Sequence, residues 1–546
     1  MGLKGKSPML GLMQDWPLTL EKFIEHARRW HSTREVVSRR ADGSIYRRNY
    51  AELYNDAMRI SGALLTHGIG IGDRVATLAM NSADHLAAWY GISGIGAVYH
   101  TINPRLHQDQ LAYIVNHADD KLIFADGIFA PILAALLPRC PGVQRVVFLT
   151  PPVQPVALPV PADSLADFAA GHDGAYQWGG FDEQSAAGLC YTSGTTGAPK
   201  GVLYSHRSNF LHALVSISPD VLNLSSRDTI LAIVPMFHAN AWGLAFATPG
   251  IGANLILPGP RLDGASVHEL IMSEKVTFAA GVPTVWLALL DYLDANGLGL
   301  GTLERVIIGG AAMPERMLHR FREHNVEVTH AWGMTEMSPM GTVCALTTKI
   351  TDLPFEEQVQ YRMKQGRPPF SVDMRLVSED GEILPHDART VGHLQVRGPA
   401  VTRAYMGETQ EAIDAEGWFD TGDIATICPQ GYMQITDRAK DVIKSGGEWI
   451  SSLQIENAVS MHAKVALAAA VGVPHPKWDE RPVLYVTLKP GMEATPDELV
   501  EFLTGRIAKW WLPDAVHFID EMPVGATGKV DKKVLRARYA ALAGAQ

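Results

Sequence analysis

Short apolar runs alternate with helical patterns along the chain, and this alternation limits the choice of fold more than any other feature. The run RVATLAM (74–80) precedes a helical pattern at 84–98, and a second helical pattern at 109–119 precedes the run KLIFAD (121–126). Such alternation is typical of parallel sheets covered by helices. Further apolar runs extend the pattern at 253–259, 276–283, 305–310 and 326–333. We therefore predict an α/β fold, in which ligands commonly bind where strands end in glycine-containing turns.

A second, smaller unit is predicted to begin near residue 437, where the sequence becomes polar and rich in glycine. Residues 495–513 predict a helix, because Thr495 is a good N-cap, a proline follows it, and Glu498 completes a capping box. The strands expected beside this helix lie at 465–474 and 481–490. Together these elements predict a compact α+β lobe.

Composition excludes several classes of protein. The net charge of −11 argues against a general nucleic-acid binder, because affinity for phosphate backbones comes mainly from clustered lysine and arginine. The chain has no apolar segment of signal-peptide length near its first residue, and its cysteines are far apart, without a C-x-x-C pair. We therefore expect a cytoplasmic protein without a disulfide framework or a metal knuckle. The cysteines are Cys140, Cys190, Cys344 and Cys428.

Residues 229–260 contain no aspartate, glutamate, lysine or arginine, which would suit a membrane span. However, Pro235, Pro249, Pro258 and several glycines interrupt the stretch. We expect no transmembrane helix and no stable membrane insertion.

The stretch YTSGTTGAPK (191–200) combines glycines, hydroxyl residues and a lysine after an apolar run that predicts a strand. Backbone amides of such a turn can surround phosphate oxygens, while the hydroxyls and Lys200 add donors and charge. The spacing differs from that of an ordinary P-loop, because Ala198 and Pro199 separate Gly197 from the lysine. From these residues alone, a surface loop and a phosphate site are equally good interpretations.

Residues 191–201 resemble the phosphate-loop motif of the adenylate-forming superfamily, which includes acyl-CoA synthetases, luciferases and peptide-synthetase adenylation domains. Further motifs of that superfamily follow in the expected order between residues 238 and 529. The resemblance implies a large N-terminal layered α/β domain with a small β-barrel subdomain, and a mobile C-terminal α+β lobe. It also implies that the phosphates of ATP are bound by Thr192, Ser193, Gly194, Thr195, Thr196, Gly197 and Lys200.

The motif VPMFHANAW (234–242) bears on the substrate. Amino-acid-activating relatives place an aspartate where this chain has His238, and a buried carboxylate would be costly beside a fatty tail. The stretch resembles medium- and long-chain fatty acyl-CoA synthetases, in which a tryptophan at the place of Trp242 gates the acyl tunnel. By itself, Trp242 would more readily be a core residue, because buried aromatic residues usually belong to the core, and only the surrounding motif favours a gate. The resemblance implies an acyl pocket formed by His238, Trp242, Val282, Gly309 and Gly310, and a catalytic role for His238.

The motif AWGMTEMSP (331–339) resembles the adenine and metal motif. Trp332 would stack on adenine, Thr335 would reach the α-phosphate, and Glu336 would bind Mg²⁺ beside Thr192. Mg²⁺ prefers hard oxygen ligands, so a carboxylate, a hydroxyl and substrate phosphates suit it. The other implied AMP-binding residues here are Gly310, Ala311 and Gly333.

Two motifs mark the predicted domain boundary. Asp423, in GWFDTGD, is implied to accept hydrogen bonds from the ribose hydroxyls, and Arg438, in DRAKD, to assist it. Lys440 is implied to be the hinge residue. The resemblance thus predicts an N-terminal acid- and ATP-binding domain, a hinge and a mobile lobe, at 1–437, 438–442 and 443–546.

The predicted lobe supplies two further motifs. KSGGEWIS (444–451) resembles the loop that approaches CoA, and PVGATGK (523–529) resembles the C-terminal motif in which Lys529 meets the acyl carboxylate and the α-phosphate. Both would have to reach one active site, which implies rotation of the lobe between steps. The implied CoA-tunnel residues are Lys444, Gly446, Gly447, Glu448 and Trp449.

We therefore predict an AMP-forming acyl-CoA synthetase that uses ATP, Mg²⁺ and CoA to activate a medium- or long-chain fatty acid. A CoA ligase for a short, methylthio or aryl acid is the alternative. A luciferase-like oxygenase and an enzyme that loads a carrier protein are alternatives from other classes. Some relatives are homodimers built through the N-terminal region, so a homodimer is expected.

Overall fold

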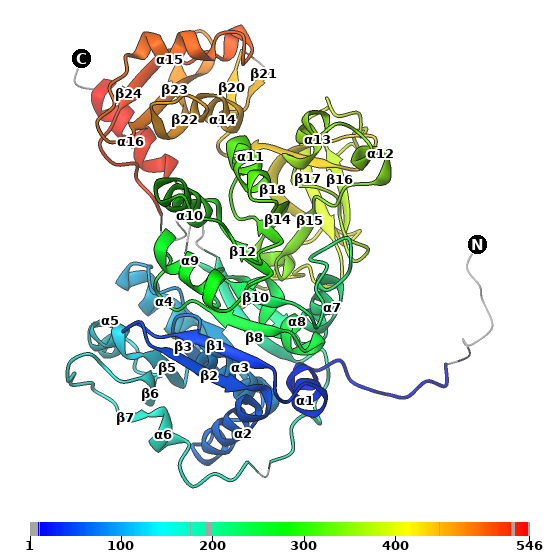
Figure 1. Cartoon of the computed structure of the whole chain (residues 1–546), viewed down its shortest axis with the longest axis vertical. Helices are drawn as coiled ribbons and strands as arrows, with labels where there is room; N and C mark the ends of the chain where they lie inside the picture. The colour runs from blue at the N-terminus through cyan, green and yellow to red at the C-terminus, as the bar shows by residue number, and fades with distance from the viewer. Residues whose placement is uncertain are drawn as a thin grey trace.

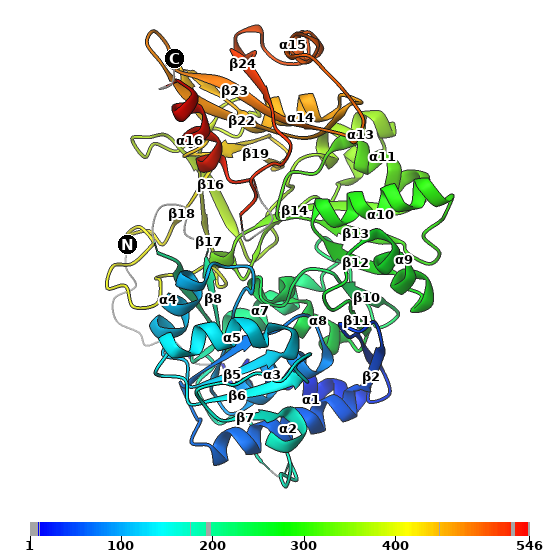
Figure 2. The same ribbon diagram turned by 90° about the vertical axis from the view of Figure 1, so that its left-hand side faces the viewer.

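The computed structural model describes residues 9, 11–174, 176–192, 198–446, 448–525 and 530–543. Figure 1 shows two sheets with their helices in the lower body, a third sheet above them, and a C-terminal lobe at the top. The N-terminal arm leaves the body on one side. Figure 2, turned by 90°, shows the same vertical order.

The alternation in the sequence produces two mainly parallel sheets. All neighbouring strands pair in parallel except at β1–β2, β14–β15 and β8–β9. The first sheet has the order β15 (Met340–Val343), β14 (Glu327–Gly333), β13 (Arg305–Ile308), β12 (Phe278–Gly281), β10 (Thr229–Ala232), β11 (Asn254–Leu257), β1 (Glu35–Arg39) and β2 (Ile45–Asn49). The second has the order β7 (Ala162–Ser164), β6 (Arg145–Thr150), β5 (Leu122–Asp126), β3 (Arg74–Leu78), β4 (Val98–Thr101), β8 (Ala186–Thr192) and β9 (Lys200–Ser205). The predicted α/β fold is confirmed.

One group of helices shares its core with both sheets, and other helices cover the outer faces. The shared core joins residues of β3, β5, β10 and β11 to the inner helices. These are α1 (Glu21–Trp30), α2 (Tyr50–Thr66), α3 (Ala83–Gly94), α7 (His206–Ser216) and α8 (Leu244–Ile251). The outer helices are α4 (Gln108–Ala118) and α5 (Ala130–Leu136) on the second sheet, and α9 (Gly264–Ser273), α10 (Pro283–Asn296) and α11 (Glu315–Glu323) on the first. Short helices lie at α6 (Leu165–Phe168), α12 (Thr348–Thr351) and α13 (Phe355–Arg362).

Helix α3 depends on this layered arrangement. Every residue of α3 except Asp84 is buried, including Trp89 and Tyr90. A helix that is apolar on all sides is stable only when other elements surround it. The two sheets and their shared helices provide that environment.

The predicted β-barrel subdomain is an open sheet among the described residues. Its order is β16 (Asp373–Val377), β17 (Gly392–Arg397), β18 (Phe419–Ile427) and β19 (Met433–Arg438), and all pairs are antiparallel. Strands β16 and β19 form its edges and do not pair with each other, so the sheet does not close on itself.

The C-terminal lobe has its own sheet and two core clusters. Strand β23 (Asp479–Leu488) lies at its centre, between β22 (Val465–His475) and β20 (Ile443–Ser445), and also pairs with β24 (Ala515–Phe518). The outer strand is β21 (Glu448–Ile450), and the helices are α14 (Ser452–Ser460), α15 (Pro496–Leu503) and α16 (Lys532–Ala543). The predicted α+β lobe is therefore present.

The helix predicted at 495–513 is shorter than expected. Thr495 is its N-cap and accepts a hydrogen bond from the Glu498 backbone, as predicted, but α15 ends at Leu503. The carboxylate of Glu498 pairs with Lys464 at 2.7 Å. Beyond Leu503 the chain turns at Gly505, whose φ is +81°.

The stretch 229–260, which has no aspartate, glutamate, lysine or arginine, does not form a membrane-spanning helix. It contains β10, a tight turn, the short helix α8 and β11. Within the part of the chain that the structure describes, no helix has the length and apolar character needed to cross a bilayer.

Candidate active site

The predicted phosphate loop joins two antiparallel strands. Thr192 ends β8 and pairs with Lys200, which begins β9. At the start of the loop, Nδ1 of His117 and the Tyr191 hydroxyl lie 2.6 Å apart. The predicted phosphate ligands Ser193, Gly194, Thr195, Thr196 and Gly197 lie outside the described residues. Their role stays a prediction.

The predicted adenine and ribose residues meet, although they lie far apart in the sequence. The indole Nε1 of Trp332 donates a hydrogen bond to Oδ2 of Asp423 at 2.9 Å. Arg438 Nε lies 2.7 Å from Oδ1 of the same carboxylate, which is only 2% exposed. Asp423 and Arg438 also face each other across the β18–β19 pair. A buried aspartate held in this way has its charge compensated and its oxygens oriented.

The start of the turn that carries Glu336 depends on a glycine. A Cβ atom at Gly333 would lie 1.8 Å from the carbonyl oxygen of Pro339, so only glycine fits. The turn that follows, η4 (Thr335–Met337), contacts β8. Tyr204 on β9 donates a hydrogen bond to the Thr335 carbonyl at 2.7 Å. The predicted α-phosphate and metal residues are thereby fixed beside the strand that leads into the phosphate loop.

Glu336 is buried, and its Oε1 accepts a hydrogen bond from the Tyr405 hydroxyl at 2.9 Å. Burial is the main cause that raises the pKa of this carboxyl above its usual value. Lys200 Nζ lies 4.6 Å from the centre of the Tyr405 ring, a cation–π contact. Tyr405 thus links the predicted metal carboxylate to the predicted phosphate lysine. Tyr405 and Tyr204 could not be predicted from the sequence, because a lone tyrosine carries no spacing signal.

The site residues fit Mg²⁺ through oxygen donors. No group of three or more histidine, cysteine, aspartate or glutamate side chains suitable for a metal occurs among the described residues. A buried carboxylate at Glu336 and a hydroxyl at Thr192 are hard donors that leave most positions to waters and phosphate oxygens. This donor set suits a metal that arrives with its nucleotide.

Four of the predicted acyl-pocket residues, Trp242, Val282, Gly309 and Gly310, lie together. A Cβ atom on Gly309 would approach Cη2 of Trp242 to 3.2 Å, and one on Gly310 would lie 3.4 Å from Cγ1 of Val282. His238 directly precedes the turn that carries Trp242, and its ring lies 4.9 Å from that of Phe237. A tryptophan therefore packs where two glycines leave space.

Gly310 and Ala311, which are also predicted to contact AMP, are exposed just after β13.

The predicted hinge is bound by the C-terminal helix. The Arg536 guanidinium donates a hydrogen bond to the carbonyl of Lys440 at 3.3 Å and pairs with Asp441 at 2.8 Å. On the preceding strand, Asp437 accepts a hydrogen bond from the Ser452 backbone at 2.6 Å. The segment that is predicted to rotate is thus attached to α14 and α16.

The predicted CoA residues are only partly described. Lys444 pairs with Glu379 at 3.2 Å, and Gly446 has a φ of +62°. The ring of Trp449 lies 6.1 Å from that of His393 on β17. Gly447, the side chain of Glu448, and Lys529 lie outside what the structure describes, so their roles stay predictions.

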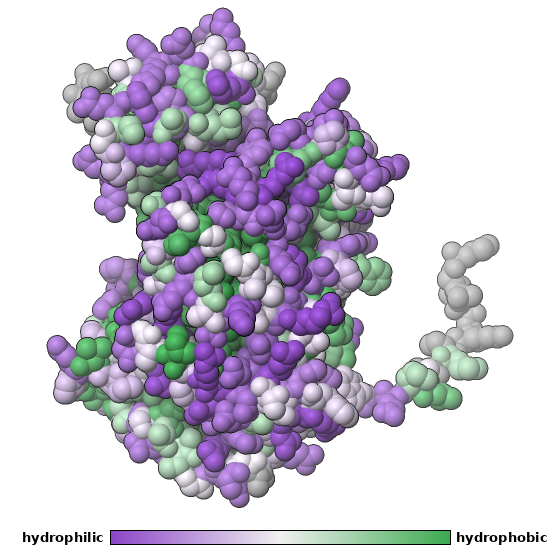
Figure 3. Space-filling model, in the orientation of Figure 1, coloured by the Kyte–Doolittle hydropathy of each residue, from purple (hydrophilic) through white to green (hydrophobic). Residues whose placement is uncertain are grey.

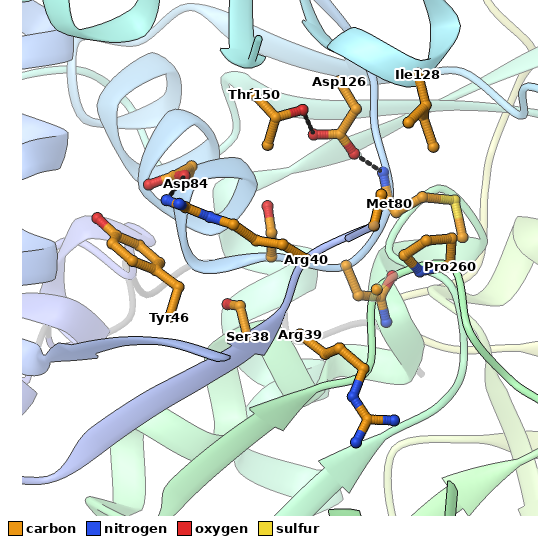
Figure 4. Close-up of a pocket in the computed structure, with 14 residues that line it drawn as sticks. Ser38, Arg39, Arg40, Tyr46, Met80, Asp84, Asp126, Ile128, Thr150 and Pro260 are labelled. Atoms are coloured by element: carbon orange, nitrogen blue, oxygen red, sulfur yellow. Dashed lines mark hydrogen bonds and ion pairs between the residues drawn. The ribbon is translucent and has the colours of Figure 1, made fainter. Parts of the chain in front are cut away.

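A separate small pocket lies away from these residues, between β1, α3 and the end of β5 (Figure 4). Arg40 extends along the Tyr46 ring toward Asp84, and its guanidinium is 4.0 Å from that carboxylate. Asp126 accepts hydrogen bonds from the Met80 backbone and the Thr150 hydroxyl. Burial raises the pKa of both aspartates to about 6.

Comparison with known proteins identifies the family. The model of the AMP-binding enzyme family matches residues 23–406, and that of the AMP-binding enzyme C-terminal domain matches residues 454–529. The chain belongs to the AMP-binding enzyme family. The predicted membership of the adenylate-forming superfamily is confirmed, and the protein is an enzyme.

Individual relatives match over nearly their whole length. The chain is 47% identical to a 3-methylmercaptopropionyl-CoA ligase of Ruegeria lacuscaerulensis, over 97% of this chain and 99% of that enzyme. It is 44% identical to a medium-chain-fatty-acid–CoA ligase of Ectopseudomonas oleovorans, over 97% and 98%. The fold is similar to that of the anthranilate CoA ligase AuaEII in complex with anthranoyl-AMP, with a TM-score of 0.86 at 23% identity, over 97% and 99% of the two chains.

Proposed function

We propose that this protein is an AMP-forming acid–CoA ligase whose preferred acid is a short methylthio acid, 3-methylmercaptopropionate. The observation that carries this proposal is the 47% identity to a ligase of that acid over 97% of the chain. The sequence motifs favoured a medium- or long-chain fatty acid, with a short, methylthio or aryl acid as the alternative. The comparison supports the alternative better.

In the first half-reaction, the acid carboxylate attacks the α-phosphorus of ATP and releases pyrophosphate. We assign Trp332 to the adenine and Asp423 to the ribose hydroxyls, since these side chains are already joined at 2.9 Å. Glu336 and Thr192 would hold Mg²⁺, which when bound offsets the negative charge of the phosphates. Lys200 and Lys529 would supply positive charge toward the phosphates and the reacting carboxylate. This chemistry depends on positioning and charge, so it requires no protein nucleophile.

In the second half-reaction, the CoA thiol attacks the acyl carbonyl and AMP leaves. We assign the CoA channel to the loop that carries Lys444, Gly446 and Trp449. Because Trp449 packs near His393 in this structure, the lobe would have to turn about Lys440 to bring the loop to the acyl-adenylate. The boundaries at 437 and 443 are part of this proposal.

A medium-chain fatty acid is the second candidate, supported by the 44% identity to a medium-chain ligase. The two substrates differ mainly in length, and each methylene in an apolar pocket discriminates by only about 10- to 200-fold. Packing of Trp242 against Gly309 supports the shorter acid, because the indole occupies space beside the glycine.

The test is a product analysis by mass spectrometry. The purified protein would be incubated with ATP, Mg²⁺, CoA and each of a series of straight-chain, methylthio and aryl acids. The proposal expects AMP and acyl-CoA together, with the highest kcat/KM for 3-methylmercaptopropionate. AMP without acyl-CoA would contradict a CoA ligase and favour a carrier-protein acceptor. Light emission or oxygen uptake would favour a luciferase-like oxygenase.

We also propose that the protein is a homodimer that assembles through its N-terminal arm. The arm, residues 9 and 11–16, extends from the body (Figure 1) and carries apolar side chains (Figure 3). Met9, Leu12 and Met13 are 98%, 93% and 88% exposed. Adjacent apolar side chains on a surface commonly mark a contact with another chain. A cytoplasmic location stays a prediction from the sequence.

A further inference from the structure

A left-handed turn precedes α8 in the predicted acyl site. Four consecutive residues that are not glycine, Ala239, Asn240, Ala241 and Trp242, have φ angles of 39°, 58°, 51° and 54°. Side chains with a Cβ atom rarely adopt this region, because the Cβ atom then approaches the following carbonyl oxygen. A run of four such residues persists only when the surroundings hold it.

A closed triangle of hydrogen bonds holds this turn. The Tyr99 hydroxyl donates to Oδ1 of Asn240 at 2.7 Å and accepts from Nδ2 of Asn209 at 3.1 Å. Nδ2 of Asn240 donates to Oδ1 of Asn209 at 3.0 Å. The three side chains are at most 2% exposed. They come from β4, α7 and the turn, so the triangle joins elements that are distant in sequence.

Neighbouring side chains hold the Tyr99 ring of the triangle in place. The Trp89 ring stacks on Tyr99 with 4.5 Å between ring centres and an angle of 10°. Its Nε1 donates to Nε2 of His85 at 3.0 Å, and Nδ1 of His85 lies 2.9 Å from the carbonyl oxygen of Met80. This arrangement fixes the plane of the Tyr99 ring and hence the direction of its hydroxyl.

The turn sets the position of the Trp242 indole. Because Trp242 is the fourth left-handed residue, a change in the turn would swing its side chain away from Gly309 and Gly310. Val282 also packs beside Gly310, so the indole and Val282 both border the space next to these glycines. A wall of this kind limits the length of an acyl chain only while the backbone beneath it is rigid.

We propose that Tyr99, Asn209 and Asn240 are positioning residues that determine acid length by locking the left-handed turn and thereby the Trp242 wall. This inference rests on the proposed function, because it assigns a cause for the preference for a short acid. None of the three residues touches the reacting atoms. Their effect is on which acid is accepted, rather than on the chemistry of adenylation.

The test compares Tyr99→Phe and Asn240→Gly with wild type. Tyr99→Phe keeps the ring on Trp89 and removes one hydroxyl. Asn240→Gly removes the amide, and glycine adopts a positive φ without penalty, so the variant is expected to fold. The matched control is Tyr50→Phe, which removes another fully buried hydroxyl that donates to the Ala253 carbonyl at 2.7 Å. The measured quantity is the ratio of kcat/KM for octanoate to that for 3-methylmercaptopropionate, together with KM for ATP.

We expect the ratio to rise by about tenfold or more in both variants, with KM for ATP unchanged, and to stay at the wild-type value in Tyr50→Phe. A ratio within about twofold of wild type in an active Tyr99→Phe would overturn the inference alone, and so would an equal rise in the control. A wild-type protein that forms no acyl-CoA would overturn the proposed function and the inference together.

Discussion

Trp332 and Asp423 are joined by a hydrogen bond of 2.9 Å between the indole Nε1 and the carboxylate. The two residues lie on β14 and β18, in different sheets, so the bond ties one sheet to the other. Arg438, at the end of β19, holds the second oxygen at 2.7 Å. The predicted adenine, ribose and domain-boundary residues thus form one cluster.

Replacement of Asp423 should weaken ATP binding more than it weakens the fold. In Asp423→Asn the shape remains, but the charge that faces Arg438 and the second acceptor are lost. Hydrogen bonds to charged groups contribute about 1.5–3 kcal/mol, so we expect KM for ATP to rise by about 10- to 100-fold. Initial-rate kinetics would measure it. The control is Asp420→Asn, an exposed carboxylate that accepts only from the nearby Gly422 backbone among the bonds described. Equal effects of both variants would refute the ribose assignment.

Lys529→Ala should separate the two half-reactions. The predicted role of Lys529 is to meet the acyl carboxylate and the α-phosphate during adenylation, and the thiol attack does not need it. We expect pyrophosphate exchange to fall by about 100-fold or more, while a synthetic acyl-adenylate is still converted to acyl-CoA. Lys533→Ala, an exposed lysine on α16, serves as the control. Equal loss of both half-reactions would contradict the assignment.

Asp126 should make stability depend on pH. Burial raises the pKa of this carboxyl from 3.8 to about 6, so the folded state binds its proton more tightly than the unfolded state does. Its contribution to stability is therefore full below about pH 4 and is lost as the pH rises through about 6. Each unit by which the pKa of the folded state exceeds that of the unfolded state corresponds to about 1.4 kcal/mol.

Melting temperatures at pH 5 and pH 7.5 test this contribution. In Asp126→Asn, the amide oxygen can still accept from the Met80 backbone and the amide nitrogen would donate to the Thr150 hydroxyl. The difference between the two pH values should therefore shift toward greater relative stability at pH 7.5. The exposed Asp352→Asn should leave the difference unchanged. If Asp126→Asn matches wild type at both pH values, the buried carboxyl does not titrate as described.

Removal of the N-terminal arm should change the oligomeric state. Deletion of residues 1–16 would remove the exposed Met9, Leu12 and Met13 together with Trp16, which packs edge-on against Phe210. We expect light scattering after size exclusion to give a dimer for the full chain and a monomer for the truncated one. A full chain that is monomeric at micromolar concentration would refute the proposed arm contact.

The alternating pattern was sufficient to predict the layered architecture. Period and turn residues are local signals, and the runs at 74–80, 121–126 and 305–310 became β3, β5 and β13. The helix predicted at 495–513 was too long. Ile507, Trp511 and Leu512 pack onto the lobe core from an irregular segment that follows α15. In this segment, the packing of these side chains onto the lobe outweighed the helical pattern of the sequence.

The motifs named the residues of the predicted nucleotide cluster but not the side chains that support them. The resemblance to the family's motifs implied roles for Asp423, Trp332 and Glu336, and the structure places the first two in contact. Tyr405 and the triangle of Tyr99, Asn209 and Asn240 gave no signal, since each comes from a different element. The left-handed turn was also unpredictable, because none of its first four residues is a glycine.

A direct competition between two acids tests the central claim. Equal concentrations of 3-methylmercaptopropionate and octanoate would be supplied to the purified protein with ATP, Mg²⁺ and limiting CoA. The ratio of the two acyl-CoA products, measured by mass spectrometry at early times, equals the ratio of the two kcat/KM values. The account predicts an excess of 3-methylmercaptopropionyl-CoA. An excess of octanoyl-CoA would contradict it and assign the protein to the medium-chain ligases.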